Sequence, residues 1–273
     1  MERPAWAPQG IDLNVPSVSR MYDYYLGGSH NFEIDREAAR QAIAAWPGLP
    51  KIMQTNRAFM RRAIRYAIGE GVTQFLDIGS GIPTFGNVHE VAQAVDPASR
   101  VVYVDNDPVA VAHSRAVLGG DGTAAIVSAD FRSPQDVLES PEVERLLDLD
   151  KPVALMLVAL LHFIEDKDEP VKTIAEFGRA LAPGSLLVIS HGSPEGGPKR
   201  DGGIGVQKVY SRTNSPLVIR SREGIERLFD GFDLVEPGLV SVPRWHPDSP
   251  PELEDAVSFS GFAGVGRKAG FAG

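Results

Sequence analysis

The sequence contains no cysteine. That absence excludes a disulfide scaffold, a metal site built from thiolates and any mechanism with a covalent cysteine adduct. It also fits a reducing compartment, and we expect a cytoplasmic protein. No apolar run is long enough to span a bilayer, so we expect no membrane partner. The first ten residues have neither the basic region nor the apolar stretch of a signal peptide, and we therefore expect none.

Positive charge is also in short supply. The formal net charge is −9, which argues against a nucleic acid partner, although local basic patches remain possible. The sequence has no His-Glu-x-x-His motif and no dense carboxylate cluster, so we expect no metal. What it does have is a hydrophobic content of 43% over 273 residues, enough for a large core and near the upper end for one α/β domain.

Roughly the first quarter of the chain reads as helix. Ser17 can cap a helix that ends at Gly27-Gly28, and Asp35 can cap a second one that stops at Pro47-Gly48. A third, with apolar residues in register up to Ile68, follows before Gly69. We therefore expect residues 1–71 to form a helical cap and residues 72–273 to form the following domain.

After the cap, short apolar runs alternate with helical signals. The runs "QFLDIG", "RVVYVD", "TAAIVS", "PVALMLVAL" and "GSLLVIS" suit parallel strands that are covered on both faces. We expect a mobile surface loop at residues 191–205, helices near 206–213 and 222–229, and strands near 232–236 and 256–265. This pattern predicts an α/β, Rossmann-like, doubly wound sheet with seven strands available.

Three strand ends carry candidate ligand-binding residues. Gly79 and Gly81 follow the first strand, where glycine allows a tight turn and a close approach of a ligand. Asp105 ends the second strand, and its carboxylate can accept both ribose hydroxyls of a nucleoside. Asp130 ends the third strand, where it can take an adenine amino hydrogen, and Phe131 either packs on the base or belongs to the core.

The same loop disfavours a dinucleotide. The dinucleotide fingerprint requires a third glycine three residues after the second, and this sequence has Thr84 there, next to Pro83. Asp77, inside the strand before the loop, would repel a phosphate and instead suits a cation such as an amino acid ammonium. A nicotinamide-dependent oxidoreductase is therefore a weaker alternative.

At these residues the sequence resembles a known family. The segments "FLDIGSG", "VVYVDNDP" and "SADF" resemble the first three motifs of class I S-adenosylmethionine-dependent methyltransferases. Together with "VPSVSRMYDYYLGGSHNFEIDREAA", "NRAFMRRA" and "GFAGVGRK", they resemble a bacterial family of S-adenosyl methyltransferases, many of unknown function. The resemblance implies a sheet whose last strand is antiparallel, S-adenosyl-L-methionine as cofactor and S-adenosyl-L-homocysteine as product. It implies cofactor contacts at Gly79, Ser80, Gly81, Asp105, Asn106, Asp130 and Phe131.

The helical cap offers further candidates. Arg57 is either a solvated charge or a clamp on the cofactor carboxylate. In "MYDYYLGGSHNF" the rings of Tyr22 and Tyr25 can lie over the sulfonium, and Gly27-Gly28 turns the chain toward Asn31. We predict that this segment covers the active site, with Tyr22 as a candidate catalytic residue and Tyr25 and Asn31 as cofactor contacts. An ordinary amphipathic helix with a glycine cap is the alternative.

The methyl acceptor is the least determined part. His162 follows the fourth strand and is the candidate general base, ahead of His191, His30 and His89. The fourth strand ends in "VALLHF" and lacks the Asn/Asp-Pro-Pro-aromatic motif of many enzymes that methylate amino groups of nucleic acids or of glutamine. We therefore favour a small molecule with an oxygen or nitrogen nucleophile. A protein that binds S-adenosylmethionine without catalysis remains an alternative, and the oligomeric state is open.

Overall fold

One central sheet organises the chain. The computed structural model describes residue 8 and residues 11–83, 86–120, 122–195, 200–249 and 261–270. Within them the strand order is β3-β2-β1-β4-β5-β8-β6, and the short β7 pairs with β8 beside this path. The strands are β1 (Gln74–Ile78), β2 (Arg100–Asp105), β3 (Ala124–Ser128), β4 (Ala154–Val158), β5 (Leu186–Gly192), β6 (Phe232–Leu234), β7 (Val240–Ser241) and β8 (Gly261–Lys268).

The sheet is parallel except at one strand. Strands β1 to β5 pair in parallel, whereas β8 runs antiparallel to both β5 and β6. The predicted doubly wound sheet with an antiparallel last strand is confirmed. Strand β7, which is only two residues long, was not predicted. Residues 256–260 of the last predicted strand lie outside the described residues.

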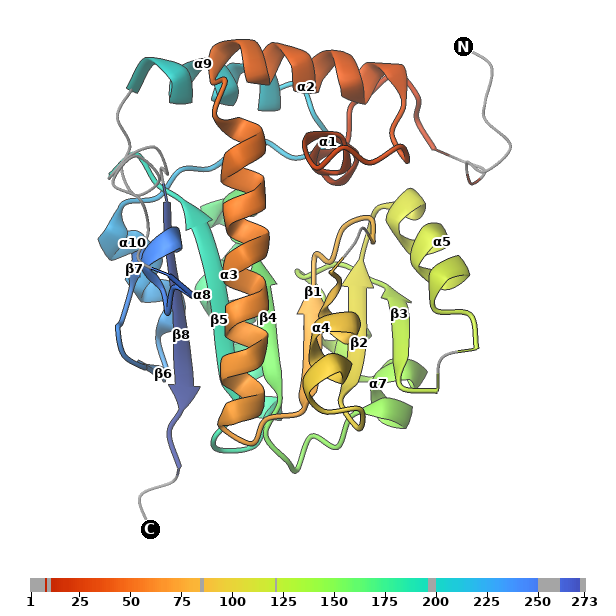
Figure 1. The fold of residues 1–273 in the computed structure, drawn as a ribbon, viewed down its shortest axis with the longest axis vertical. Coiled ribbons are helices and arrows are strands. Elements are labelled where there is room, and N and C mark those ends of the chain that lie inside the picture. The colour runs from red at the N-terminus through yellow and green to blue at the C-terminus, as the bar shows by residue number, and fades with distance from the viewer. Residues whose placement is uncertain are drawn as a thin grey trace.

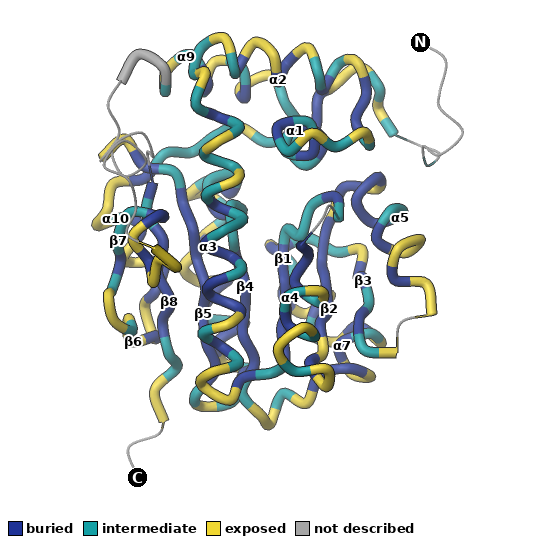
Figure 2. The backbone as a smooth tube through the Cα atoms, in the orientation of Figure 1, coloured by how far each residue is buried: buried dark blue, intermediate teal, exposed yellow. Residues whose placement is uncertain are grey.

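Both faces of the sheet are buried, as the continuous apolar runs predicted. Along β1, Phe75 joins the core cluster on one face and Leu76 joins the cluster on the other. Helices α3 and α4 cover the first face, and α6, α7, α8 and α10 cover the second. These helices are α3 (Leu49–Gly69), α4 (Val88–Val95), α6 (Pro134–Leu138), α7 (Pro141–Leu146), α8 (Pro170–Ala180) and α10 (Arg222–Glu226). Figure 2 shows that the strands are buried along most of their length.

The remaining helices lie at the carboxyl end of the parallel strands. Figure 1 shows α1, α2 and α9 across that end, with α3 descending from them along the sheet. Helix α5 begins directly after β2 and faces α1 from below. These helices are α1 (Val18–Tyr25), α2 (Glu33–Ala45), α5 (Pro108–Val117) and α9 (Arg200–Tyr210). Four 3₁₀ turns complete the described elements: η1 (Leu161–Phe163), η2 (Asp166–Asp168), η3 (Arg227–Phe229) and η4 (Val242–Arg244).

One predicted N-cap residue is wrong, and another is correct but does not bond to its own helix. Asp35 is not the N-cap of α2, because the helix begins at Glu33 and Asp35 occupies its third position. From there the Asp35 carboxylate accepts a hydrogen bond from the backbone N–H of Phe32, so it caps the helix from inside. Ser17 is the N-cap residue of α1, but its hydroxyl donates to Asp107 of the sheet domain and not to its own helix.

Helix α9 corrects the predicted loop at residues 191–205. His191 and Gly192 belong to β5, and residues 200–205 are helical, while residues 196–199 lie outside the described residues. Three glycines made this segment look like a loop, since glycine disfavours a helix interior. The reason it folds is packing: α9 lies against α2, and a Cβ on Gly205 would come within 2.7 Å of the Ala45 Cβ. A glycine is needed there for the close approach of the two helices.

None of the helices in the described segments is long and apolar enough to cross a membrane.

Candidate active site

The loop after β1 is shaped for a ligand. Gly79 and Gly81 have φ angles of +73° and +68°, which favour glycine. A Cβ on Gly79 would collide with Leu160 at 2.6 Å, whereas a Cβ on Gly81 would meet nothing within 4 Å. Between them the buried Ser80 hydroxyl has no hydrogen-bond partner among the described residues. An unpartnered buried polar atom beside open space indicates a place where a ligand completes the hydrogen bonding.

Two carboxylates face this loop from the ends of β1 and β2. Asp105 accepts hydrogen bonds from the backbone N–H groups of Gly81 (2.7 Å) and Asp107 (2.8 Å), and burial raises its pKa to about 6. Burial also raises the pKa of Asp77 to about 7; Arg57 opposes this shift and the charge of Asp105 adds to it. Two carboxylates held with raised pKa values are stabilised by a ligand that brings hydroxyl donors or positive charge.

The end of β3 has a different geometry from the one predicted. Asp130 accepts hydrogen bonds from Asn106 Nδ2 (2.7 Å) and from three groups of Arg132 at 2.7–2.9 Å, chiefly its guanidinium. Arg132 lowers the pKa of Asp130 to about 2. Each carboxylate oxygen thus already has two donors, so an adenine amino group has to compete with Arg132 or Asn106 for it. Phe131 stacks on Phe177 with ring centroids 6.0 Å apart and is mainly a core residue that also lines the cavity described next.

These groups line one cavity of about 110 Å³, which we call the polar cavity. It collects most of the predicted site residues, namely Tyr22, Arg57, Asp77, Gly79, Ser80, Gly81, Asp105, Asn106, Asp130 and Phe131. Arg57 lies on α3, where its guanidinium donates to the Gly86 carbonyl at 3.1 Å. A nucleoside that carries a cationic amino acid group fits this cavity. It can bond to the unpartnered Ser80 hydroxyl, enter the open space at Gly81 and stabilise the ionised forms of Asp77 and Asp105, whose pKa values are raised.

A second cavity of about 310 Å³, the apolar cavity, lies under α9 and beside the first. Its walls come from the cap and from the ends of β4 and β5. They include Trp46, Leu49, Ile52 and Met53 of the cap, Val206 and Tyr210 of α9, and Leu217 and Ile219 of the segment after it. The two cavities share Val18, Tyr22, Asn56, Ala159 and Phe163. A molecule in one cavity can therefore meet a molecule in the other at these five residues.

A chain of hydrogen bonds crosses this junction. The Ala159 N–H donates to Ser190 Oγ (3.0 Å), which donates to Asn56 Oδ1 (2.6 Å). Asn56 Nδ2 donates to the Tyr22 hydroxyl (3.0 Å), and that hydroxyl donates to the Met53 carbonyl (3.4 Å). Ala159 has a φ of +57°, a conformation that non-glycine residues rarely adopt and that clusters at functional sites. Neither Asn56 nor Ser190 was predicted as a site residue: Asn56 opens the segment "NRAFMRRA", where Arg57 was the candidate, and Ser190 ends a predicted strand.

His162 and His191 line the apolar cavity and not the polar one. His191 is fully engaged: its Nδ1 donates to the Gly192 carbonyl (2.6 Å), and its Nε2 accepts from Arg220 (2.9 Å). His162 Nδ1 accepts from the Gly192 N–H at 3.4 Å. Burial lowers the pKa of His162 well below its usual value and that of His191 to about 4, so both rings are neutral.

Tyr25 and Asn31 lie away from both cavities. The Tyr25 hydroxyl accepts a hydrogen bond from Tyr210 (3.2 Å) inside the cap, and burial raises the pKa of both phenols. Asn31 is 3% exposed, and its amide donates to Asp23 (2.7 Å) and to the Gly28 carbonyl (3.0 Å). The structure thus gives both residues a role in shaping the cap, and their predicted contact with the cofactor has no support from their positions.

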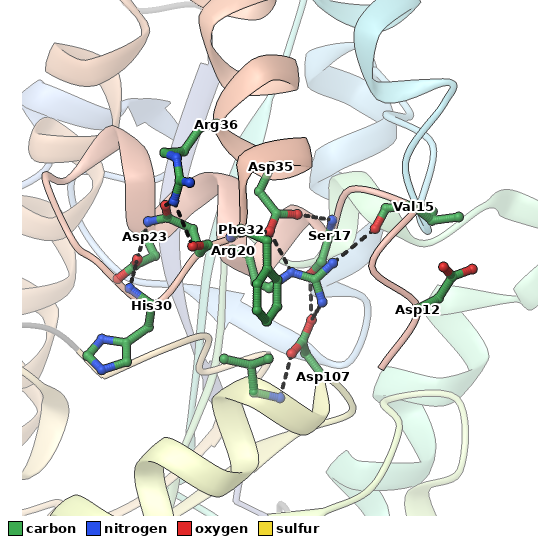
Figure 3. Close-up of polar contacts among 12 residues, drawn as sticks. Asp12, Val15, Ser17, Arg20, Asp23, His30, Phe32, Asp35, Arg36 and Asp107 are labelled. Atoms are coloured by element: carbon green, nitrogen blue, oxygen red, sulfur yellow. Dashed lines mark hydrogen bonds and ion pairs between the residues drawn. The ribbon is translucent and has the colours of Figure 1, made fainter. Parts of the chain in front are cut away.

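A buried charge network ties the cap to the sheet domain, as Figure 3 shows. Arg20 of α1 forms an ion pair with Asp35 of α2 (2.8 Å) and another with Asp107 (3.5 Å), and all three side chains are at most 4% exposed. Ser17 reinforces it through its hydroxyl to Asp107 (2.5 Å). Asp107 caps α5 and also donates its N–H to Asp105, so we call this cluster of Ser17, Arg20, Asp35 and Asp107 the latch.

Among the described residues, no group of three or more histidine, aspartate or glutamate side chains is arranged to hold a metal ion.

Comparisons with known proteins agree with this geometry. A family model described as S-adenosyl methyltransferase matches residues 4–269. A crystal structure of a candidate methyltransferase from Thermobifida fusca YX has 38% sequence identity and a TM-score of 0.90, and the match covers 98% of this chain and 100% of that one. A DUF574 family protein from Streptomyces avermitilis MA-4680 has 39% identity and a TM-score of 0.86, over 93% of this chain and 98% of that one.

More distant structures share the fold alone. Human N-acetylserotonin methyltransferase, solved in complex with SAM, has 12% identity and a TM-score of 0.50, and the match covers 91% of this chain and 62% of that one. Among curated proteins, no match to the chain was found.

Proposed function

The chain belongs to the S-adenosyl methyltransferase family, and from that premise we propose that it methylates a small molecule, held in the apolar cavity, on an oxygen or nitrogen atom. Family membership makes it an S-adenosylmethionine-dependent methyltransferase and removes the nicotinamide alternative. The observation that carries the rest is the pairing of two cavities with different walls and five shared residues. The polar cavity suits the methyl donor, and the apolar cavity remains for the methyl acceptor.

The residues of the polar cavity suit the donor one by one. Asp105 is placed to accept the ribose hydroxyls, and Asp77 is placed to balance the ammonium group of the methionine part. Arg57 supplies a guanidinium for the carboxylate, and Ser80 has a hydroxyl in need of a partner. S-adenosylmethionine brings a methyl group already activated on a sulfonium, so the protein has to hold and align the reactants and exclude water.

The dimensions and walls of the apolar cavity support a small-molecule acceptor. Its volume of about 310 Å³ is in the range of sites that enclose a small ligand. Residues of the cap and of α9 line this cavity together with residues at the ends of β4 and β5, so several elements surround an acceptor there. A nucleic acid acceptor would face a protein whose formal net charge is −9.

The test fills the apolar cavity without touching the polar one. Gly203 lies on α9, lines the apolar cavity, and a Cβ there meets no atom within 4 Å. Gly203→Phe should fill part of the cavity, while Gly203→Ala is the matched control that adds helix propensity and little volume. Methyl transfer is followed with S-adenosylmethionine labelled in its methyl group and a cell extract divided into small-molecule and polymer fractions.

We expect label in the small-molecule fraction with the wild-type protein and with Gly203→Ala. Gly203→Phe should lose most of this transfer and still bind S-adenosylhomocysteine with wild-type affinity in calorimetry. Label in the protein or nucleic acid fraction, or transfer that Gly203→Phe leaves intact, would refute the proposal.

A further inference from the structure

We infer that the acceptor is an uncharged, flat aromatic amine or nitrogen heterocycle, which attacks through a neutral nitrogen lone pair. This inference rests on the proposed function and deepens it, because it selects nitrogen over oxygen and names the acceptor class. Three properties of the apolar cavity carry it: the lack of ionised walls, the lack of a proton acceptor and the arrangement of its aromatic rings.

The described walls of the apolar cavity carry no formal charge. Within the described part of the chain, no aspartate, glutamate, lysine or arginine lines it. Its two imidazoles are neutral, because burial lowers the pKa of both. An acceptor with a carboxylate, a phosphate or an ammonium group would lose its hydration there without gaining a counter-charge. The cavity therefore selects for an uncharged molecule.

His191 cannot take a proton from the acceptor. Its Nδ1 donates to the Gly192 carbonyl, and its Nε2 accepts from Arg220. Arg220 is itself fixed by Asp166 (2.6 Å) and by the carbonyls of Leu161 (2.7 Å) and Ile164 (2.8 Å). Protonation of His191 Nε2 would place a second positive charge next to the Arg220 guanidinium, which its other hydrogen bonds hold in place. The ring is a structural element between β5 and the turn after β4.

His162 holds its proton on the wrong nitrogen for a base. A histidine base normally donates from one nitrogen to a carbonyl or carboxylate, so that the other keeps its lone pair for the substrate. Here the neighbour of Nδ1 is an N–H donor, that of Gly192, so Nδ1 keeps the lone pair and Nε2 carries the hydrogen. His162 is thus a hydrogen-bond donor toward the acceptor, and it positions the acceptor instead of deprotonating it.

The junction supplies no base either. Burial raises the pKa of the Tyr22 phenol, which therefore stays protonated, and Asn56 is not ionisable. A hydroxyl nucleophile would have to lose its proton in this environment before or during attack. A neutral nitrogen has no such need: its lone pair forms the N–CH₃ bond while the S–CH₃ bond breaks and its electron pair stays on sulfur. The positive charge passes from sulfur to nitrogen, and any N–H proton leaves to water after product release.

The aromatic walls favour a flat molecule. The rings of Phe163 and Tyr210 stack with centroids 5.6 Å apart and an interplanar angle of 22°. Both line the apolar cavity, together with Trp46 and Tyr22. Aromatic side chains in several walls provide apolar contact surface for an aromatic ligand, and such rings can attract the positive charge that the product carries on nitrogen.

Four bicyclic probes of similar shape test the inference: isoquinoline, 1-naphthylamine, 1-naphthol and 1-naphthoic acid. Calorimetry on protein saturated with S-adenosylhomocysteine measures binding, and mass spectrometry after incubation with S-adenosylmethionine identifies the methylated atom. We expect the three neutral probes to bind, the naphthoate to bind at least tenfold more weakly, and methylation of the two nitrogen probes alone. Tighter binding of the naphthoate, methylation of naphthol oxygen, or failure of all neutral probes to bind at millimolar concentration would overturn the inference.

Two variants of one residue separate positioning from base catalysis. His162→Gln keeps a donor amide near the place of Nε2 and cannot act as a base, whereas His162→Ala removes both. We expect His162→Ala to slow methylation of 5-hydroxyisoquinoline, whose hydroxyl oxygen can accept from Nε2 while the ring nitrogen attacks, by up to about tenfold, and His162→Gln to recover most of that loss. A loss of about 10²–10⁴-fold in both variants is the signature of a general base and would contradict the inference. Methylation on oxygen that Gly203→Phe abolishes would overturn the nitrogen assignment and leave the proposed function standing.

Discussion

The two cavities of this methyltransferase are neighbours with opposite chemistry. The polar cavity is built at the ends of β1, β2 and β3 from glycines, carboxylates and an arginine. The apolar cavity is built from the helical cap, α9 and the ends of β4 and β5; no aspartate, glutamate, lysine or arginine lines its described part, and its two histidines are neutral. The residues of the first cavity suit a ligand held by charge and hydrogen bonds, and those of the second suit a ligand held by shape and burial.

We call the polar cavity and its walls the donor half of the site, and the apolar cavity and its walls the acceptor half. The difference between them sets how freely mutations can change the ligand of each. Hydrogen bonds from a carboxylate to two hydroxyls require a fixed backbone, and the tight turn of Gly79 with the N–H of Gly81 on Asp105 provides it. An apolar wall tolerates exchange of one hydrophobic residue for another of similar size. The donor half is therefore constrained to one ligand, and the acceptor half is free to change its substrate while the fold and the donor stay the same.

Removing the Asp105 carboxylate should weaken binding in the polar cavity only, and this should be the largest loss of affinity among the variants. Asp105→Ala takes away two expected hydrogen bonds to the ribose, each contributing about 1.5–3 kcal/mol, so affinity for S-adenosylhomocysteine should fall about 100-fold or more. Binding of the neutral bicyclic probes to the apolar cavity should stay within about twofold. Calorimetry with each ligand measures both values. Equal losses at both cavities would show that the two halves are not separate.

The sequence predicted the donor half well because that half is local. A glycine loop and a carboxylate at the end of a strand are fixed by their neighbours in sequence, and parallel strands bring them to one edge. Phe131 illustrates the limit: it lies at the predicted place, yet most of its ring stacks on Phe177, a residue of α8 that no local pattern connects with it. Asp130 is likewise in place, but Arg132 and Asn106 already occupy its oxygens.

The rest of the site was hard to predict because distant segments assemble it. Tyr25 and Asn31 were predicted as cofactor contacts, but neither lines the polar cavity: Tyr25 pairs with Tyr210, and Asn31 pairs with Asp23. The role of His162 depends on the backbone group next to its ring. That group is the N–H of Gly192, at the end of β5, far from His162 in the sequence. The first half of α9, residues 200–205, was predicted as a loop because glycine disfavours a helix interior, and packing on α2 overrides that propensity.

We expect the latch to hold the cap against the sheet domain and thereby to preserve both cavities. Arg20→Met leaves Asp35 and Asp107 buried without their cation, and breaking such a pair costs about 3–5 kcal/mol. We expect a large loss of thermal stability together with weaker binding in both cavities. The matched control is Arg40→Met on α2, because the Arg40 ion pairs with Glu33 and Glu37 are exposed and such pairs contribute at most about 1 kcal/mol. Equal effects of the two variants would mean that the latch does not hold the cap.

Acid should weaken the donor half alone. Burial raises the pKa of Asp77 to about 7 and that of Asp105 to about 6, so the free protein holds protons that a cationic, hydroxyl-bearing ligand must displace. Each carboxylate that must lose its proton lowers the affinity for S-adenosylhomocysteine about tenfold per pH unit below its own pKa. The affinity should therefore fall about tenfold per unit between pH 7 and 6 and about 100-fold per unit below pH 6, with proton release on binding near neutral pH. In the free protein the sign is opposite, since folding stability from these two groups is highest at low pH and declines as pH rises toward 7. Asp77→Asn should flatten the upper part of the binding profile, and an unchanged profile would remove Asp77 from the site.

Tyr22 lies in both cavities, and its ring and hydroxyl can be tested separately. Tyr22→Phe keeps the ring and removes the hydroxyl that links Asn56 to the Met53 carbonyl, so binding in either cavity should change by less than about threefold. Tyr22→Leu also removes the ring face. If that face attracts the sulfonium, Tyr22→Leu should lower the ratio of the affinity for S-adenosylmethionine to that for S-adenosylhomocysteine, which lacks the sulfonium. The expected factor corresponds to about 0.5–1 kcal/mol, and the ratio should not fall in Tyr22→Phe. A ratio that stays constant in both variants would assign Tyr22 to packing between the halves, and the segment "MYDYYLGGSHNF" would then cover the active site without touching its charge.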